Sequence, residues 1–266
     1  MQLGLNDRVV IVSGGARGIG AACCSAFVDE GARVVLADRD ATATAALAQQ
    51  LRERGGTVEP IVADLQDAAA CQRVVEHAAT TFGQLDVLVN NAGFNDAMGL
   101  DQPPERFASS VLANLLHAYA LAHYAVPLLR TSRGAIVNVS SKVSVTGQGA
   151  TSGYAAAKGA INALTREWAV ALAADGVRVN CVLPAECLTD QYQRWFDAQP
   201  DPRAAEQSVA RLVPLGHRLT TAEEVAATIV FLASPRSSHT TGQLVFVDGG
   251  YTHLDRAASH AHGKWS

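Results

Sequence analysis

The sequence predicts an α/β protein with one doubly wound parallel sheet of the Rossmann type, and two observations predict it. Short apolar runs rich in branched residues recur along the chain without polar alternation, which is typical of strands covered on both faces. Longer Ala-rich segments, for example 41–54 and 68–82, separate these runs, and such strand–helix alternation indicates right-handed βαβ crossovers. The expected strands are residues 9–12, 34–37, 59–63, 85–89, 135–139, 177–183 and 243–247.

Composition favours a single domain over the whole chain, residues 1–266. With 48% hydrophobic residues the chain can bury one sizeable core, and no repeat, low-complexity linker or composition shift marks a second domain. The net charge of −4 provides no basic field for nucleic acid or an anionic membrane. We therefore expect neither as a partner.

The cysteines and the N-terminus predict a cytoplasmic protein. Five cysteines scattered through apolar runs suit buried thiols in a reducing compartment. The chain lacks an uninterrupted apolar stretch of the roughly 18 residues that a spanning helix needs. Residues 1–8 also lack the basic-then-apolar pattern of a signal peptide.

The first expected strand runs directly into a glycine-rich turn, residues 13–20 (SGGARGIG). Glycine has no Cβ, so the backbone can turn tightly and approach a pyrophosphate, while the next helix offers free N–H groups and the positive end of its dipole. The octapeptide alone is a weak signal, but it opens a βαβ unit, which is the context that supports a dinucleotide site. Gly14, Gly18 and Gly20 are its expected phosphate-binding glycines.

Carboxylates end or follow the next two strands. Asp38 can accept hydrogen bonds from both hydroxyls of the adenosine ribose, and its charge repels a 2′-phosphate, which favours NAD. Arg17 and Arg39 lie where a 2′-phosphate could be met, so NADP stays possible. Asp64 and Leu65 follow the third strand, where they either meet the adenine edge or cap the strand end.

The fourth strand leads into an asparagine-rich turn, residues 90–93 (NNAG). Asparagine side chains readily bond neighbouring main chain. We therefore expect Asn91, Ala92 and Gly93 to wall the cofactor, although the same residues are ordinary turn formers.

Tyr154 and Lys158 are spaced i, i+4 on an expected helix, so they share a face. A phenol with its ordinary pKa of about 10 is a poor base at neutral pH. A neighbouring ammonium and the positive nicotinamide of the oxidised cofactor would favour the phenolate and lower that pKa. Tyr154 could then take the proton of an alcohol as hydride leaves.

Two further polar residues accompany this pair. Ser141 ends the fifth strand, and Asn114 lies in the middle of an apolar helical run. A buried amide needs a partner. Asn114 is therefore either a satisfied core amide or a member of a water relay towards Lys158.

Together these motifs resemble the short-chain dehydrogenase/reductase family over nearly the whole chain: SGGARGIG, NNAG, Ser141, YAAAK and Pro184 after the sixth strand. The resemblance implies that Tyr154 is the acid/base and that Lys158 binds the nicotinamide ribose. It further implies that Ser141 holds the substrate oxygen, that Asn114 completes a proton relay and that the protein is a homotetramer or homodimer. The implied cofactor contacts are Gly14, Arg17, Gly18, Ile19, Gly20, Asp38, Arg39, Asp64, Leu65, Asn91, Ala92, Gly93, Tyr154, Lys158, Pro184 and Thr189.

Two positions depart from the family pattern. Ser13 stands where threonine is usual. Ala185 stands where glycine usually follows Pro184, so the loop on the nicotinamide side can differ in shape. Neither departure changes the assignment.

Polar and aromatic residues gather near the expected mouth of the site, and they favour a ligand covered with hydroxyl groups. A steroid or a long acyl chain would instead call for an apolar lining. Each residue has an ordinary alternative: turn formation for Asn95, helix capping for Glu186 and core packing for Trp195. The expected substrate-binding residues are Asn95, Ser141, Gln148, Tyr154, Glu186 and Trp195.

Within the family, longer stretches resemble a subgroup of bacterial L-fucose dehydrogenases: NNAGFNDAMGLD, SSKVSVTGQGATSGYAAAKGA, LTREWAVAL, LPAE and SPRSSHTTGQLVFVDGGYTHLDRA. That resemblance implies NAD(P)-dependent oxidation at C1 of L-fucose, or of a related aldose such as D-arabinose or L-galactose, to a lactone. Two alternatives in the same family stay open. One is a 3-oxoacyl carrier reductase, against which Asp38 and the net charge argue, and the other is a dehydrogenase of hydroxysteroids or other secondary alcohols.

Two segments leave the regular strand–helix rhythm. Residues 185–214 indicate a helical insertion over the carboxyl ends of the strands, which is either a substrate lid or plain surface packing. The tail, 252–266, carries His253, His260 and His262, which suit a solvated tail or an intersubunit contact better than a metal. The chemistry needs no metal, and we expect none.

Overall fold

A seven-stranded, entirely parallel sheet organises the protein, whose computed structural model describes residues 2–254. The strands are β1 (Val9–Ser13), β2 (Arg33–Asp38), β3 (Thr57–Val62), β4 (Val87–Asn90), β5 (Ala135–Val139), β6 (Arg178–Pro184) and β7 (Leu244–Val247). The helices are α1 (Gly18–Asp29), α2 (Ala41–Glu53), α3 (Ala68–Phe82), α4 (Pro104–Ser132), α5 (Ser152–Leu172), α6 (Asp190–Asp197), α7 (Pro202–Ala210) and α8 (Ala222–Ala233), with short 3₁₀ turns η1 (Lys142–Ser144), η2 (Ala173–Asp175) and η3 (Pro235–Ser237). All seven expected strands and the doubly wound fold class are confirmed, with shifts of one or two residues at the ends.

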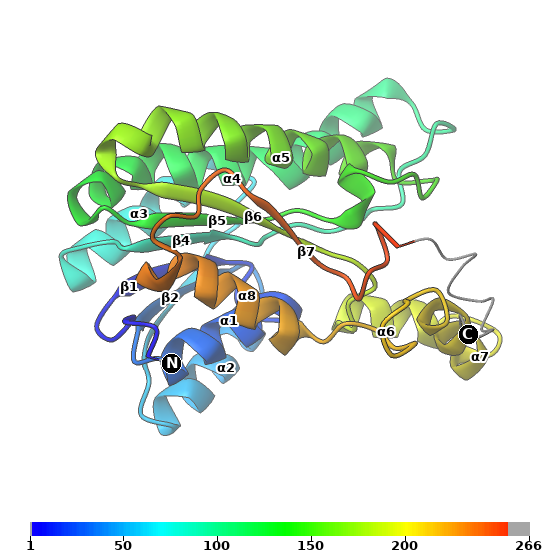
Figure 1. Cartoon of the computed structure of the whole chain (residues 1–266), viewed down its shortest axis with the longest axis horizontal. Helices are drawn as coiled ribbons and strands as arrows, with labels where there is room; N and C mark the ends of the chain where they lie inside the picture. The colour runs from blue at the N-terminus through cyan, green and yellow to red at the C-terminus, as the bar shows by residue number, and fades with distance from the viewer. Residues whose placement is uncertain (1, 255–266) are drawn as a thin grey trace, which may run out of the picture.

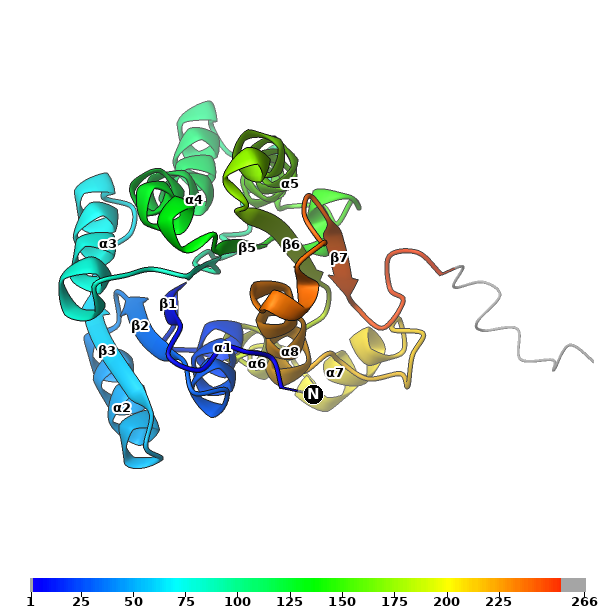
Figure 2. The ribbon, with the colours of Figure 1, turned by 60° about the vertical axis from the view of Figure 1, so that its left-hand side comes forward.

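Two layers of helices cover the sheet. Helices α3, α4 and α5 lie on one face and α1, α2 and α8 on the other (Figures 1 and 2). The strand order is β3-β2-β1-β4-β5-β6-β7, so the order reverses between β1 and β4. In such sheets a ligand binds beyond the carboxyl ends of the strands at this switch point. Topology thus selects the end of the sheet where chemistry is expected.

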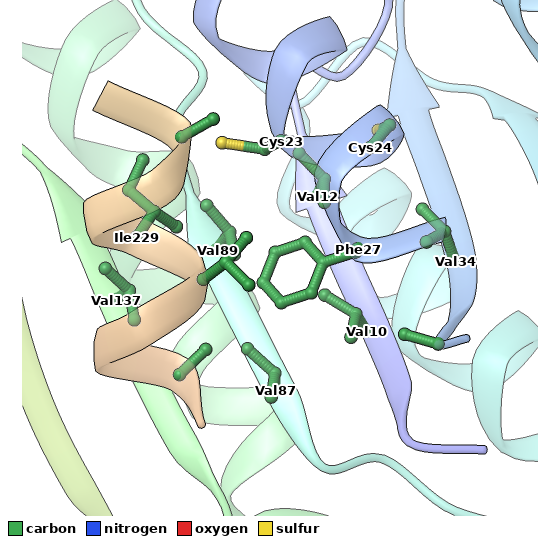
Figure 3. Close-up of a cluster of buried hydrophobic side chains, with 14 of the residues drawn as sticks. Val10, Val12, Cys23, Cys24, Phe27, Val34, Val87, Val89, Val137 and Ile229 are labelled. Carbon is green, nitrogen blue, oxygen red and sulfur yellow. The ribbon is translucent and has the colours of Figure 1, made fainter. Parts of the chain in front are cut away.

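The core consists of two large apolar clusters, one on each face of the sheet. On the α1 and α8 face, Phe27 fills the space between the strands and α8, with Val10, Val87 and Val89 around its ring (Figure 3). Every residue of β1 and β4 is buried, which explains why these strands read as continuous apolar runs rather than alternating ones. The edge strand β3 accommodates Pro60, where a missing ladder hydrogen bond is tolerated.

Helix α4 is the one described helix that is long and apolar enough to cross a membrane by length and composition. Its place in the fold accounts for that composition. It lies between α3 and α5, and Leu121 and Leu129 on its inner face are fully buried in the core (Figure 2). A core helix covered on one side by a sheet and on two flanks by helices needs an apolar surface of this kind.

The segment 185–214 forms two short helices near the carboxyl ends of β6 and β7 (Figure 1). Thr189 caps α6 by accepting from the Tyr192 N–H, and Asp201 caps α7 by accepting from the Ala204 N–H. The sequence correctly predicted helices here. His253, from the tail, packs edge-on against Phe246 at 4.4 Å, while His260 and His262 lie outside the described residues.

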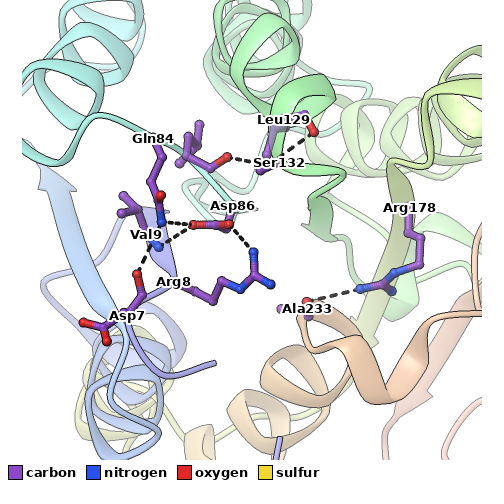
Figure 4. A network of polar contacts seen from close by, with 10 residues as sticks. Asp7, Arg8, Val9, Gln84, Asp86, Leu129, Ser132, Arg178 and Ala233 are labelled. Carbon is purple, nitrogen blue, oxygen red and sulfur yellow. Dashed lines mark hydrogen bonds and ion pairs between the residues drawn. The ribbon is translucent and has the colours of Figure 1, made fainter. Parts of the chain in front are cut away.

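The opposite, amino-terminal edge of the sheet is fixed by the buried carboxylate of Asp86, just before β4 (Figure 4). One oxygen accepts from the Arg8 guanidinium at 2.6 Å, and the other accepts from the Val9 N–H at 2.8 Å and the Gln84 amide at 2.9 Å. The first residue of β1 is therefore anchored to the start of β4. Hydrogen bonds to a buried charged group are among the stronger ones, so this edge stabilises the sheet without touching its carboxyl end.

Replacing Asp86 by Ala leaves the Val9 N–H and the Arg8 guanidinium without their acceptor. We expect the free energy of unfolding to fall by about 2–3 kcal/mol, because buried donors lose a charged partner. Urea titration followed by circular dichroism measures the change. Asp29→Ala removes an exposed carboxylate that pairs with Arg54 and serves as the control, with an expected change below about 1 kcal/mol. Equal losses in the two variants would contradict the anchoring role of Asp86.

Candidate active site

The carboxyl ends of β1 and β4 are joined by one hydroxyl and one amide. The Ser13 hydroxyl accepts from the Asn91 N–H at 3.0 Å and the Ala92 N–H at 3.1 Å, and it donates to the Val89 carbonyl at 3.2 Å. The Asn91 amide in turn donates to the carbonyls of Ser13 and Gly14, both at 3.0 Å. The hydroxyl group of Ser13 makes these bonds by itself, so the methyl group of the usual threonine is not needed for them.

The glycine-rich turn is packed so closely that side chains are excluded from it. A Cβ on Gly20 would lie 2.0 Å from the Gly14 carbonyl oxygen and 2.7 Å from the Asn91 amide nitrogen. Gly14 and Gly18 have positive φ angles of 63° and 51°, which glycine adopts without strain. Thr189 lies over Gly18, with its methyl 3.2 Å from the position of a Cβ there. A bare backbone cradle at the start of α1 and at the switch point fits a dinucleotide pyrophosphate.

Charged side chains line the rim of the glycine-rich turn, on the side where the adenosine of a dinucleotide is expected. Asp38 accepts from the Ala16 N–H at 3.1 Å and the Asp40 N–H at 3.0 Å, so its carboxylate is oriented by the loop. Arg17 pairs with Asp40 at 2.8 Å and with Asp190 at 3.5 Å. Its guanidinium is therefore already matched to carboxylates, which also raise its pKa.

Three other predicted cofactor residues lie around this rim. Arg39 reaches over the ring of Phe94, 5.6 Å from its centroid. Asp64 is exposed and accepts from the Gln66 N–H at 3.1 Å, the arrangement of a strand-end cap. Leu65 is buried beside it as part of the core.

The predicted catalytic residues come together beyond β5. Tyr154 and Lys158 both lie on α5, and the Lys158 ammonium is 5.5 Å from the centroid of the Tyr154 ring. Lys158 is buried and donates to the Val139 carbonyl at 2.8 Å. Against the larger effect of burial, the Ser141 hydroxyl is close enough to Tyr154 to lower the pKa of its phenol. The expected Ser–Tyr–Lys constellation is thus present in the geometry.

Burial pulls the two titrating groups towards neutrality. It raises the pKa of the Tyr154 phenol to about 12, against a smaller lowering by the hydrogen bond with Ser141. Burial also lowers the pKa of Lys158 to about 8. The sequence predicted a lowered phenol pKa, and the described residues alone give the opposite direction because desolvation outweighs the favourable contact.

Asn114 belongs to the same site through Gly93. Its amide oxygen accepts from the Phe94 N–H at 2.8 Å and its amide nitrogen donates to the Ser110 carbonyl at 3.0 Å, so it is a satisfied buried amide. A Cβ on Gly93 would lie 3.2 Å from both the Asn114 amide oxygen and the Lys158 ammonium. The side chains of Asn114 and Lys158 therefore both lie next to the backbone of Gly93. A proton relay between them requires this proximity.

A buried polar chain holds α5 in place under the site. The Asn90 amide donates to the Asn138 side chain at 2.9 Å, and Asn138 donates to the Thr165 hydroxyl at 2.9 Å. The Ser140 hydroxyl also donates to the Lys158 carbonyl at 2.9 Å. Because β4, β5 and α5 share these bonds, the helix that carries Tyr154 has a fixed register on the sheet.

The predicted substrate residues divide into separate groups. Asn95 accepts from the Ala97 N–H at 3.0 Å, which is turn geometry. Gln148 is exposed on the loop before α5, and Trp195 on α6 is about half exposed, 49%. Gln148 and Trp195 are therefore accessible to a ligand, whereas the Asn95 side chain is engaged in a bond within its own turn.

Glu186 is buried, and both its carboxylate oxygens are engaged. One pairs with the Lys142 ammonium and the other accepts from the Tyr192 hydroxyl. Helix capping, the ordinary alternative for Glu186, is not the role the structure shows, because Thr189 caps α6.

Sequence reasoning missed Lys142 and the buried amides of Asn90 and Asn138. The signal for Lys142 was a lone lysine directly after Ser141, matched by a lone glutamate after the next strand of the sheet. Opposite charges at the carboxyl ends of neighbouring strands are placed to meet. The amides carried a weaker signal, since each is one polar residue at the end of an apolar strand.

Comparison with known proteins agrees with this geometry. A family model described as enoyl-(acyl carrier protein) reductase matches residues 14–252. The L-fucose dehydrogenase of Mus musculus is 41% identical over 247 residues, which cover 92% of this chain and 88% of that protein. A 3-oxoacyl-[acyl-carrier-protein] reductase of Thermotoga maritima is 35% identical over 248 residues, 92% of this chain and 98% of that protein.

A solved structure shows the same fold. The L-sorbose reductase of Gluconobacter frateurii, complexed with NADPH and L-sorbose, superposes with a TM-score of 0.91 at 30% identity, over 96% of this chain and 100% of that one. The glycine cradle, the Ser141–Tyr154–Lys158 arrangement and these similarities lead to one conclusion. The chain belongs to the short-chain dehydrogenase/reductase family and is an oxidoreductase that acts on CH–OH groups.

Proposed function

We propose that this enzyme oxidises L-fucose, or a related aldose such as D-arabinose or L-galactose, at C1 to the lactone, with NAD as the hydride acceptor. The observation that carries the reaction is the Lys158 ammonium beside the Tyr154 ring, 5.5 Å from its centroid, with the Ser141 hydroxyl next to the phenol. The choice of substrate is supported by the 41% identity to a mammalian L-fucose dehydrogenase.

The protein residues divide the work of the reaction. Ser141 holds the C1 oxygen of the sugar next to Tyr154, and the Tyr154 phenolate removes the hydroxyl proton as the C1–H bond breaks. When bound, the nicotinamide takes up the hydride, and its oxidised ring adds positive charge near the phenol. Lys158 contributes the second positive charge, and Asn114, through the Gly93 region, links Lys158 to the proton relay.

Two features of the rim support NAD over NADP. The Asp38 carboxylate is held by two backbone N–H groups at the end of β2, where a 2′-phosphate would meet its charge. Arg17 is paired with Asp40 and Asp190, so a phosphate would compete with two carboxylates for its guanidinium.

A 3-oxoacyl carrier reductase is the second candidate, favoured by the description of the family model and by the Thermotoga maritima relative. The net charge of −4 offers no basic surface to an acidic carrier protein. The half-exposed Trp195 and the exposed Gln148 suit a polar ring better than an acyl chain.

We also propose a homodimer or homotetramer for this enzyme in the cytoplasm. Helices α4 and α5 expose large apolar side chains, among them Leu112, Tyr119 and Val170. Tyr119 packs near Trp168 across the two helices, 6.4 Å between ring centroids. Association through this face would remove that apolar surface from water.

A substrate panel tests the proposed function directly. L-Fucose, D-arabinose, L-galactose, L-rhamnose, a steroid alcohol and a hydroxyacyl thioester are each supplied with NAD and with NADP, and reduced cofactor is followed by absorbance. We expect the highest kcat/KM for L-fucose with NAD. Turnover confined to the thioester or the steroid would discard the sugar and keep the Tyr154 chemistry.

The pH dependence of oxidation tests the roles of Tyr154 and Lys158. Because the phenolate is the active form, kcat/KM at saturating NAD should rise with pH through the phenol pKa of the complex. Lys158→Met removes a positive charge that stabilises the phenolate, so this limb should move upward by about 1 pH unit or more. Rates from pH 6 to 10.5 measure it. If kcat/KM rises at the same pH in the wild-type enzyme and in Lys158→Met, the electrostatic role of Lys158 is refuted.

Tyr154→Phe removes the acid/base hydroxyl. We expect kcat to fall at least ~10²-fold while NAD binding is retained.

Cofactor choice tests Asp38. Asp38→Asn keeps the size of the side chain and an acceptor for the loop but removes the charge. We expect the NADP/NAD ratio of kcat/KM to rise at least ~10-fold, about 1.4 kcal/mol. Asp64→Asn, at the end of the neighbouring strand, is the matched control and should leave the ratio unchanged. An unchanged ratio in the Asp38 variant would place ribose recognition elsewhere.

A further inference from the structure

A buried ion pair joins the carboxyl ends of β5 and β6 beside the catalytic serine. Lys142, the residue after Ser141, pairs with Glu186, which follows β6. The two strands are hydrogen-bonded neighbours up to the pairing of Val139 with Val182. Lys142 and Glu186 are only 7% and 6% exposed, so the pair is shielded from water.

The pair extends to two further segments. The Tyr192 hydroxyl on α6 donates to the second oxygen of Glu186. The ring of Tyr251, after β7, lies under the Lys142 ammonium, 4.0 Å from it to the centroid. Four segments from the ends of three adjacent strands therefore meet around two opposite charges.

The pair lies between the two loops that the reaction uses. On one side, the Ser141 hydroxyl accepts from the Val143 N–H at 3.4 Å and so caps the turn η1 that carries Lys142. On the other side, Glu186 lies three residues before Thr189, which caps α6 and contacts Gly18 of the cofactor cradle. A shift of either charge would move a loop that carries site residues.

The contacts continue from Tyr192 to the predicted substrate residue on α6. The Tyr192 ring contacts Trp195 at 5.9 Å and Phe196 at 5.1 Å between centroids, and Phe196 is buried. The position of the half-exposed Trp195 is thus set from below by Phe196 and Tyr192. Glu186 influences the mouth through this aromatic cluster.

The buried pair is the stronger of two charged contacts next to α6. Removing one partner of a buried ion pair leaves an uncompensated charge in a low-dielectric site, which is strongly unfavourable. The contact between Arg17 and Asp190 of α6 is exposed and 3.5 Å long, and such surface pairs contribute little. Breaking the buried pair, which α6 reaches through Tyr192, should therefore disturb α6 more than breaking the exposed one.

We propose that Lys142 is a positioning residue: through Glu186 and Tyr192 it holds α6 over the Ser141 loop and so fixes the sugar-binding mouth. This role rests on the proposed function of the same site. Both Glu186 oxygens are engaged, so Glu186 acts through the pair rather than as a free acceptor for sugar hydroxyls.

The test uses the full-length enzyme with Lys142→Met, Glu186→Gln, the double variant and Tyr192→Phe. Sugar concentration is varied at saturating NAD, and NAD at saturating sugar. We expect Lys142→Met to raise KM for L-fucose at least ~10-fold, because misplacing a binding group by about 1 Å can cost ~10²-fold. KM for NAD should change less than ~3-fold. Tyr192→Phe removes one neutral donor and should show a smaller effect of the same kind.

A second readout needs no turnover. Trypsin cleavage after Arg194, Arg203 and Arg211 reports the accessibility of α6 and α7 in each variant, and we expect it to accelerate at least ~10-fold in Lys142→Met, since opening now costs less. Arg130→Met, which breaks the exposed pair with Asp175, is the control and should leave both cleavage and KM unchanged.

The double variant separates positioning from general stability. It contains no unpaired buried charge, so it should fold at least as stably as Lys142→Met while keeping the raised KM and the fast cleavage. A native KM for L-fucose in the double variant would overturn the proposal, as would unchanged cleavage in Lys142→Met. If the wild-type enzyme turns over no sugar, the proposed substrate fails, and the cleavage rates still decide whether Lys142 holds α6.

Discussion

The structure depends on one close approach, where β1 and β4 end side by side at the switch point. Ser13 and Asn91 join the two strand ends, and Gly14 and Gly20 lie so near them that a side chain on either would collide with backbone or amide atoms. The bonds between Ser13 and Asn91 also position the next residues of the chain up to Gly93, whose backbone lies beside Asn114 and Lys158. The glycine-rich turn and the backbone beside Asn114 and Lys158 therefore depend on the same packing, and its loss would displace both.

The chemistry requires that burial and charge act against each other at Tyr154. Desolvation, opposed by a smaller contribution from Ser141, raises the pKa of the phenol to about 12, so in the proposed mechanism the phenol keeps its proton until positive charge is close. His117 shows how strongly the same interior disfavours charge: burial, with a smaller contribution from Lys158, lowers its pKa to about 3. Neither of its ring nitrogens has a hydrogen-bond partner among the described residues. A neutral imidazole adds no positive charge to that of Lys158, which lies 5.5 Å from the centroid of the Tyr154 ring.

The sequence predicted the sheet and the placement of Tyr154 and Lys158 side by side on one helix, because both follow from local pattern. Buried parallel strands are continuous apolar runs, and Tyr154 and Lys158 share a helical face by spacing alone. The turn formed by Asn95 is a local contact that the sequence offered as an alternative, whereas the pair of Glu186 with Lys142 joins two distant strand ends and could not be read from local pattern. The lowered phenol pKa was expected with the oxidised cofactor bound and stays a prediction; what spacing could not give is the depth of burial, which raises the pKa of Tyr154 in the protein by itself.

The two buried lysines that follow Ser141 in the sequence, Lys142 and Lys158, have opposite kinds of partner. Lys142 has a carboxylate partner, so its charge is neutralised locally and serves to hold loops together. Lys158 has a neutral carbonyl as its partner, and burial lowers its pKa to about 8 without removing its charge at neutral pH. A carboxylate beside Lys158 would stabilise the ammonium but cancel its field at the phenol. In the proposed mechanism, the carbonyl partner of Lys158 therefore costs stability but leaves the field of its ammonium available to Tyr154. The Lys142–Glu186 pair neutralises its own charge locally and does not oppose that field.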